Sequence, residues 1–387
     1  MSSLVSKKDL IAKYLLQLTI VVTIFSQMEA FSAMFRPLMY AFWLLLLGYS
    51  LAVNKGKIYI SSFTVSFLFC YGIFALFCLL QLWLNSDYVV ASYLNIMLIP
   101  LMVSIVSNLL DQKLSKDYVV SICKTYVVCA LIFAAYINIT FFASYQAWLA
   151  SKQYLFASKN SAAQIWCTAI LIIYYIILPV ARRKYLWYAS AFYLLVLCGL
   201  SQCRTAMLGL ACVLVFNILM HSKHKVKWLL ILCFSLCGVL LLSETRQFIS
   251  QAFLLDKYAG ADLNTMSSGR LGSYAKAIDV FCNSPFFGVG RYYVDCSYIY
   301  ILVENGIIGF LLIEYVWLKR IISNLRIKYS LYTRPRMLTS FVIFYFIESL
   351  LEGQPPFGPG VSSFMFWFLS EFKSIKERKA EKWSPNA

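Results

Sequence analysis

The chain has 387 residues, of which 61% are hydrophobic and only 13% are charged, and its formal net charge is +17 at pH 7. Soluble domains carry about 25% charged residues, so this composition excludes an ordinary soluble protein and predicts one whose solvent is mostly lipid. The first apolar run begins near Leu10 and has no small-residue cleavage site before the next run, so we interpret it as a span and not as a signal peptide.

Apolar stretches that are long enough to cross a bilayer follow one another along most of the chain. A hydrocarbon core about 30 Å thick requires about 20 apolar residues in a helix. We therefore expect an all-α polytopic membrane protein with about twelve transmembrane helices. The expected spans are 10–27, 37–53, 59–84, 88–110, 118–142, 161–181, 186–203, 205–221, 228–243, 297–317, 337–353 and 361–372.

Basic residues predict the orientation of these spans. If both termini lie in the cytoplasm, that side holds 25 of the 34 basic residues and six of the 17 acidic ones, so its net charge is +19 and that of the rest is −2. Membrane proteins concentrate lysine and arginine in cytoplasmic loops in this way. The basic excess therefore indicates topology and contact with anionic lipid, and it does not indicate nucleic-acid binding.

The outer side of this topology holds two long segments, 143–160 and 244–296. No internal repeat is evident. We expect a single membrane domain over residues 1–387, in which the large outer loop 244–296 precedes a late span.

Motif absences limit the chemistry that this protein can perform. The two histidines, His221 and His224, lie on the predicted cytoplasmic side, and the chain has no Walker loop, D-x-D pair, G-x-S-x-G elbow or H-E-x-x-H helix. Its cysteines lie mostly in apolar runs and show no C-x-x-C spacing. We expect no metal and no cofactor, so any chemistry must use arginines, carboxylates, tyrosines and amides.

Four cations on the outer side run against the predicted charge bias. Arg204 lies in "SQCRTAMLGL", Arg270 in "SSGRLGSYAKA", Arg291 in "GVGRYYVD", and Lys159 precedes Asn160 in "ASKNSAAQIW". The planar donor fork of arginine matches phosphate oxygens, so converging arginines could hold a diphosphate without a metal. The alternative is neutral loop pairing, because the outer loop 244–296 has five basic and five acidic residues.

Several acids and tyrosines could complete a site with these cations. Asp295 stands just before the tenth span, where it is either a helix N-cap or a general base for an acceptor hydroxyl. Glu304 lies nine residues further on, and we expect it to have a structural role. Glu348 and Glu352 end the eleventh span and could line the same cavity, and Tyr292 could stack on a sugar.

Three sequence segments together resemble a known superfamily. The run from "SSGR" through "NSPFFGVG" to "DCSYIYILVENGIIGF" resembles the motif region of the O-antigen ligase and Wzy-type O-antigen polymerase superfamily. "SQCRTAMLGL" and "ASKNSAAQIW" resemble two upstream motifs of the same superfamily. The resemblance covers roughly residues 155–312, in the expected order and with a large outer loop before a late span.

The resemblance implies a metal-independent glycosyltransferase of the GT-C type at the periplasmic face of the bacterial inner membrane. The two family arginines correspond to Arg204 and Arg270. Ligases have a histidine, often followed by asparagine, where this chain has Asp295 and Cys296. This departure favours an O-antigen polymerase in which Asp295 is the base.

A polymerase of this kind would join oligosaccharide repeat units linked to undecaprenyl diphosphate, which serve as donor and acceptor. Its partners would be these lipid-linked glycans, membrane lipid and a chain-length regulator. Besides the arginines and the base, we expect substrate contacts from Lys159, Asn160, Arg291, Tyr292 and Glu352. Two alternatives are an O-antigen ligase that uses lipid A-core as acceptor, and a lipid-linked oligosaccharide flippase.

Overall fold

The computed structural model describes most of the chain, and every regular element in the described part is a helix. The described residues are 7–56, 60–84, 92–111, 114–141, 159–222, 224–241, 250, 262–267, 269–325, 334–353, 355–357 and 363–371. The expected all-α class is thereby confirmed for these ranges. Large parts of the two long outer segments, 142–158, 242–249 and 251–261, lie outside the described residues.

A helix occurs at each of the expected spans. These helices are α1 (Lys7–Phe25), α2 (Glu29–Val53), α3 (Ser62–Leu84), α4 (Ser92–Leu110), α5 (Lys116–Phe141), α7 (Lys159–Ile172) with the π-helical turn η2 (Ile173–Ile177), α8 (Lys184–Leu200), α9 (Arg204–His221), α10 (Lys225–Leu241), α14 (Ser297–Leu325), α15 (Arg334–Leu351) and α16 (Phe364–Glu371). The short α12 (Leu263–Met266) and the longer α13 (Arg270–Asn283) belong to the outer loop 244–296.

Six helices of the described part are long and apolar enough to cross a membrane. They cover Phe31–Val53, Ser62–Trp83, Tyr93–Leu110, Asp117–Thr140, Asn160–Ile177 and Ser297–Leu325. Lys184–Leu200 and Arg204–Met220 are shorter apolar helices. The chain therefore has the helices of a multi-pass membrane protein, and the expected total of about twelve spans stays a prediction.

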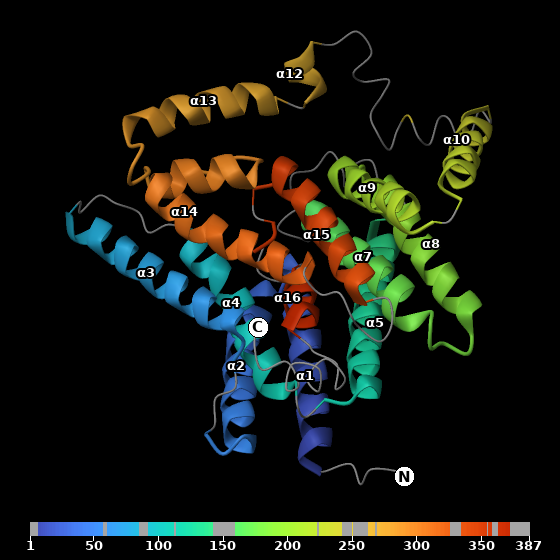
Figure 1. Cartoon of the computed structure of the whole chain (residues 1–387), viewed down its shortest axis with the longest axis horizontal. Helices are drawn as coiled ribbons and strands as arrows, with labels where there is room; N and C mark the ends of the chain where they lie inside the picture. Colours follow the sequence, from blue (N-terminus) through green and yellow to red (C-terminus); the bar gives the residue numbers. More distant parts are fainter. Residues whose placement is uncertain are drawn as a thin grey trace.

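Helix α14 is the centre of the half of the molecule that carries the sequence motifs (Figure 1). It packs against α3 on one side and α15 on the other, and α15 also packs against α9. Helix α13 lies across the end of this group and contacts α14. The rings of Trp317 on α14 and Tyr345 on α15 are buried, and both lie against Phe366 of α16. This packing brings the starts of α9, α13 and α14 to one end of the molecule, which we call the α13 end.

Helix α14 is broken at Gly306, whose φ of 65° and ψ of −175° are not helical. A loop that carries the "NSPFFGVG" motif enters this break. The N–H groups of Val289 and Gly290 donate to the carbonyls of Val303 and Glu304, each at 3.0 Å. Those carbonyls would bond to the N–H groups of residues 307 and 308 in an unbroken helix.

The displaced N–H groups find partners in the same loop. Ile307 donates to the carbonyl of Pro285 at 2.9 Å, and Ile308 donates to that of Phe286 at 3.4 Å. The loop therefore replaces the helix hydrogen bonds that the break removes, as buried backbone requires. This exchange explains why the two motif segments, "NSPFFGVG" and "VENGIIGF", occur together: each one completes the backbone of the other.

The structure lengthens the tenth expected span, because α14 continues to Leu325 instead of ending at residue 317. The extension carries Arg320, which the sequence analysis counted among the cytoplasmic loop charges. Its side chain is only 1% exposed. An ion pair with Glu371 in α16 accounts for this burial, and it is described below.

Candidate functional site

A tight turn between α8 and α9 brings Arg204 to the α13 end. The N–H groups of Gln202 and Cys203 return to the carbonyls of Gly199 and Cys198, which closes the last turn of α8. Gln202 has a left-handed φ of 54°, so the chain reverses within three residues. Helix α9 then begins at Arg204, whose side chain is half-buried.

Helix α13 begins at Arg270 because a polar turn fixes its first residues. The carboxylate of Asp262 accepts the N–H of Asn264 at 3.1 Å, and the Asn264 side-chain oxygen accepts the N–H of Gly272 at 2.8 Å. Helices commonly start with such bonds from Asp or Asn to free N–H groups. The turn therefore positions the guanidinium of Arg270 at the junction of α9, α14 and α15.

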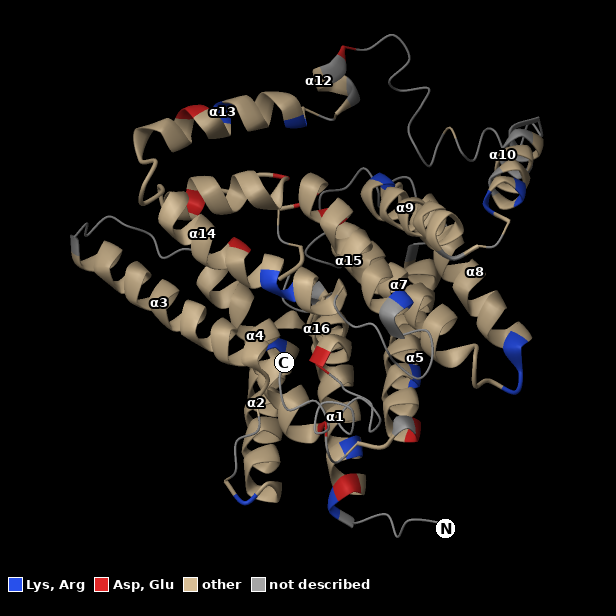
Figure 2. Ribbon diagram, in the orientation of Figure 1, with Lys and Arg blue, Asp and Glu red and all other residues tan. Residues whose placement is uncertain are grey.

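The carboxylate of Glu352, at the end of α15, connects three of the sequence motifs. Its Oε1 accepts bonds from Arg270 Nη2 at 2.9 Å and from Thr205 Oγ1 at 3.1 Å. Its Oε2 accepts a bond from Asn160 Nδ2 at 2.8 Å. The starts of α7, α9 and α13 thus meet at one carboxylate, and Figure 2 shows a basic residue at the start of α9 and of α13. Arg204 adjoins Thr205, so the structure brings both expected arginine segments to this site.

Asp295 lies on the other side of Arg270. Its Oδ2 is 3.7 Å from Arg270 Nε, and its side chain is 41% exposed against 21% for Arg270. Tyr274 OH donates to the backbone carbonyl of Asp295 at 2.5 Å and fixes this segment against α13. Helix α14 begins at Ser297, and the carbonyl of Cys296 accepts the bond from Tyr300 at 2.8 Å. Cys296 is therefore the N-cap, so the N-cap alternative for Asp295 is wrong.

Burial and charge act in opposite directions on this cluster. Burial disfavours a charged carboxylate at Glu352, whereas the guanidinium of Arg270, 2.9 Å away, favours it. Arg270 binds Glu352 and Asp295 through Nη2 and Nε, and its Nη1 makes no bond within the described part of the chain. The arrangement is an arginine held by two carboxylates, with donors left over for an anion.

Other expected site residues lie around this cluster or outside its reach. Arg291 is exposed in the segment between α13 and α14. Tyr292 is partly buried and packs against the core, whereas the neighbouring Tyr293 is 61% exposed and is the better placed of the two to meet a sugar. Lys159 is the first residue of α7, and the position of its side chain lies outside the description.

Thr205 and Gln164 were not among the predicted site residues. Thr205 follows Arg204 directly, and its hydroxyl binds Glu352. Gln164 lies one turn after Asn160 on α7, and its amide donates to Glu348 Oε2 at 2.8 Å. The spacing of Asn160 and Gln164 places two amides on one helix face, and this spacing could have identified Gln164 from the sequence. The acids Glu348 and Glu352 show the same spacing on α15.

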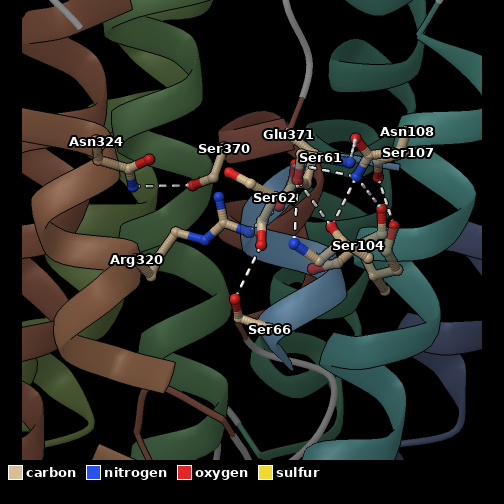
Figure 3. Close-up of polar contacts among 12 residues, drawn as sticks. Ser61, Ser62, Ser66, Ser104, Ser107, Asn108, Arg320, Asn324, Ser370 and Glu371 are labelled. Atoms are coloured by element: carbon tan, nitrogen blue, oxygen red, sulfur yellow. Dashed lines mark hydrogen bonds and ion pairs between the residues drawn. The ribbon is translucent and has the colours of Figure 1, made fainter. Parts of the chain in front are cut away.

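A second polar cluster joins α3, α4, α14 and α16 at a different place (Figure 3). Arg320 Nη2 donates to Glu371 Oε1, and the guanidinium lies over the ring of Phe63 with 3.4 Å to its centroid. Glu371 Oε2 accepts further bonds from Ser61 at 2.9 Å and Asn108 at 3.0 Å. Arg320 and Glu371 are buried, Ser61 and Asn108 are half-buried, and the ion pair connects α16 to α14.

Neither metal ligation nor a disulfide is evident in the described ranges. No group of three or more His, Cys, Asp or Glu residues there could hold a metal ion. Cys282 is exposed and Cys296 is buried, and both are free thiols. The sequence had left open whether these two residues pair, and the structure shows that they do not.

The fold and this site describe a multi-pass helical membrane protein with a charged cluster at one end, in which arginine and carboxylate meet. Residues 189–313 match the Wzy_C family model, whose description is O-antigen ligase. The match supports membership of the O-antigen ligase/polymerase superfamily, as the sequence motifs had indicated. The matched region contains Arg204, Arg270 and Asp295. No curated protein matches the chain.

Proposed function

We propose that this protein is a Wzy-type O-antigen polymerase, which joins undecaprenyl-diphosphate-linked repeat units at the periplasmic face of the inner membrane. The observation that carries the proposal is the meeting of the three motif segments at Glu352, with Arg270 between Glu352 and Asp295. The family match covers the same segments. Ligases and polymerases of this superfamily would use the same lipid-linked donor.

In this mechanism Arg270 and Arg204 bind the donor diphosphate. Their charge stabilises the negative charge that develops as the diphosphate leaves the anomeric carbon. The acceptor hydroxyl forms the new glycosidic bond to that carbon, and Asp295 takes the hydroxyl proton. The bond between the anomeric carbon and the diphosphate oxygen breaks, undecaprenyl diphosphate departs, and the anomeric centre inverts.

Each residue has a place in the cluster that fits its proposed role. Asp295 is the more exposed of the two acids beside Arg270, so an acceptor sugar can reach it. Glu352 is 6% exposed, so it positions Arg270 and does not act on the acceptor. Asn160 supports Glu352 from α7. Lys159, Arg291, Tyr292 and Tyr293 are proposed as secondary substrate contacts.

The test is complementation of a deletion strain followed by glycan profiling. We expect Arg204→Ala, Arg270→Ala and Asp295→Asn each to lower long-chain glycan by about 10²-fold or more while the protein still inserts in the membrane. Lys276→Ala is a matched control, because Lys276 is exposed on α13 and contacts none of the cluster residues among the described contacts. Full polymer from both arginine variants would contradict the diphosphate role.

The profile of the deletion strain itself separates the candidate functions. A single repeat unit on the lipid core indicates a polymerase, and unattached polymer indicates a ligase. Repeat units that stay on the inner leaflet indicate a flippase. Because Asp295 and Cys296 stand where ligases have histidine and asparagine, we expect the first result.

A further inference from the structure

Two carboxyl groups lie one above the other on α15, and two amides on α7 face them. Asn160 binds Glu352 at 2.8 Å, and one turn deeper Gln164 binds Glu348 at 2.8 Å. Both acids are buried, with 6% exposure for Glu352 and 0% for Glu348. Within the described part of the chain, Glu352 forms an ion pair with Arg270, whereas Glu348 forms none. The two acids therefore have similar neutral donors but different charge compensation.

Glu348 lacks the partners that a buried negative charge requires. Its Oε2 accepts the bond from Gln164, and its Oε1 has no hydrogen-bond partner within the described part of the chain. A buried carboxylate with one neutral donor and no counter-ion is strongly disfavoured, and such a group takes up a proton instead.

The charged groups around this pair come from two segments. Helix α13 contributes Arg270, and the segment before α14 contributes Asp295. Helix α7 contributes the neutral amides of Asn160 and Gln164, and α9 contributes the hydroxyl of Thr205. With Glu348 neutral, Arg270 stands between the two carboxylates of Glu352 and Asp295.

A diphosphate that binds Arg270 would disturb this balance. It would compete with Glu352 Oε1 for the donor at 2.9 Å and bring at least two negative charges to the site. Glu352 would then be buried with only Thr205 and Asn160 as donors, beside another anion. Like charge and burial both favour the protonated form of a carboxyl group.

We infer that Glu348 stays neutral throughout and that Glu352 takes up one proton from solvent when a diphosphate binds Arg270. This inference rests on the proposed diphosphate site and deepens it. Glu352 is then a positioning residue that holds Arg270 in the empty site and competes with weakly bound anions. When the diphosphate product leaves, Glu352 returns its proton to solvent and pairs with Arg270 again. Diphosphate affinity therefore weakens as pH rises, since the required proton becomes scarcer.

The test measures proton uptake with farnesyl diphosphate as the probe and the full-length protein in dodecyl maltoside. Calorimetric titrations at one pH in buffers of different ionisation enthalpy give the number of protons taken up per ligand bound. We expect up to about one proton, and a Kd that rises by up to about tenfold per pH unit. Heat that is independent of the buffer, together with a Kd that is independent of pH, would overturn the inference.

Variants assign the proton to one acid. Glu352→Gln mimics the protonated form, so we expect tighter binding, no proton uptake and a Kd independent of pH. Glu348→Gln mimics the neutral acid, so binding and uptake should match the wild type, and lost uptake would refute the assignment to Glu352. If one of these variants does not fold, the buffer and pH dependence of the wild type still tests proton uptake, and the other variant tests the assignment to Glu352.

Arg270→Ala separates this inference from the proposed function. One outcome is that the wild type binds the probe without proton uptake and that Arg270→Ala abolishes binding. In that case the diphosphate site is supported and the proton inference fails. If Arg270→Ala binds the probe as the wild type does, the proposed site fails and the proton inference fails with it. Lys276→Ala serves as the control, because its side chain is exposed on α13.

Discussion

The pair of Arg320 and Glu371 shows how much one buried contact can contribute to the stability of the bundle. Both side chains are almost fully buried, at 1% and 3% exposure, and Glu371 receives two further bonds from α3 and α4. The removal of one partner from a buried ion pair leaves an uncompensated charge, which costs about 3–5 kcal/mol. The replacement of both partners removes that penalty.

We therefore expect Arg320→Met to destabilise the protein by about 3–5 kcal/mol. The double variant Arg320→Met/Glu371→Gln should recover most of this loss, because glutamine can still accept bonds from Ser61 and Asn108. Thermal unfolding in detergent, followed by tryptophan fluorescence, measures both effects. Equal stability of the single and double variants would contradict the assignment of the loss to an unpaired charge.

The same pair shows why residue roles were only partly predictable. Arg320 and Glu371 are 51 positions apart, and each one lies near a predicted span end, where a charge normally reaches solvent. Arg270, Asp295 and Glu352 could be predicted as candidate site residues from residue type and predicted membrane side. Their mutual contacts could not, because Arg270 and Glu352 are separated by 82 positions and only packing brings them together.

At the scale of elements, the break in α14 depends on two glycines that face each other. Gly306 and Gly288 both have positive φ, of 65° and 76°. A Cβ on Gly306 would lie within the Phe286 backbone, 2.3 Å from its carbonyl oxygen, and one on Gly288 would lie 2.4 Å from the Glu304 carbonyl oxygen. The φ and ψ of Gly306 fall in a region that essentially only glycine occupies. The loop and the helix can therefore exchange hydrogen bonds only while both positions lack a side chain.

We expect Gly306→Ala to lower the yield of folded protein sharply, because backbone strain of about 1–3 kcal/mol adds to the clash with Phe286. Gly72→Ala is the matched control, since Gly72 is helical in α3 and a Cβ there meets nothing within 4 Å. The control should be neutral or slightly stabilised. Size-exclusion profiles of the detergent-extracted variants measure the difference, and a monodisperse Gly306→Ala protein would contradict this interpretation of the break.

Element positions were largely predictable, because apolar runs of span length are a strong signal of helices. The start of the expected span 297–317 was predicted correctly. The break at Gly306 was not, because an apolar sequence does not indicate where a helix is interrupted and another segment supplies the missing hydrogen bonds. The "NSPFFGVG" and "VENGIIGF" motifs were noted for their resemblance to a family. That they pair through backbone hydrogen bonds follows from the structure and not from either motif alone.

At the scale of the whole molecule, the charge asymmetry predicts which end of the bundle faces which compartment. With 25 of the 34 basic residues on the predicted cytoplasmic side, α13 and the cluster around Glu352 should face the periplasm, and the start of α10 should face the cytoplasm. The lipid-linked repeat units would then reach the cluster from the outer leaflet. The number of spans between α10 and α13 determines whether the two helices face the same side of the membrane. A direct measurement of their sidedness therefore also tests the expected count of about twelve spans.

Cysteine labelling can measure this sidedness with positions that the structure places at the surface. Cys282 is exposed near the end of α13, so Cys282→Ser should remove the labelling of intact spheroplasts by a membrane-impermeant maleimide. In that background Lys276→Cys on α13 should react from outside. His224→Cys, exposed just before α10, should react only after the membrane is permeabilised. The reverse pattern would place the Glu352 cluster in the cytoplasm, away from any periplasmic substrate, and the polymerase proposal would then fail even if every arginine variant were inactive.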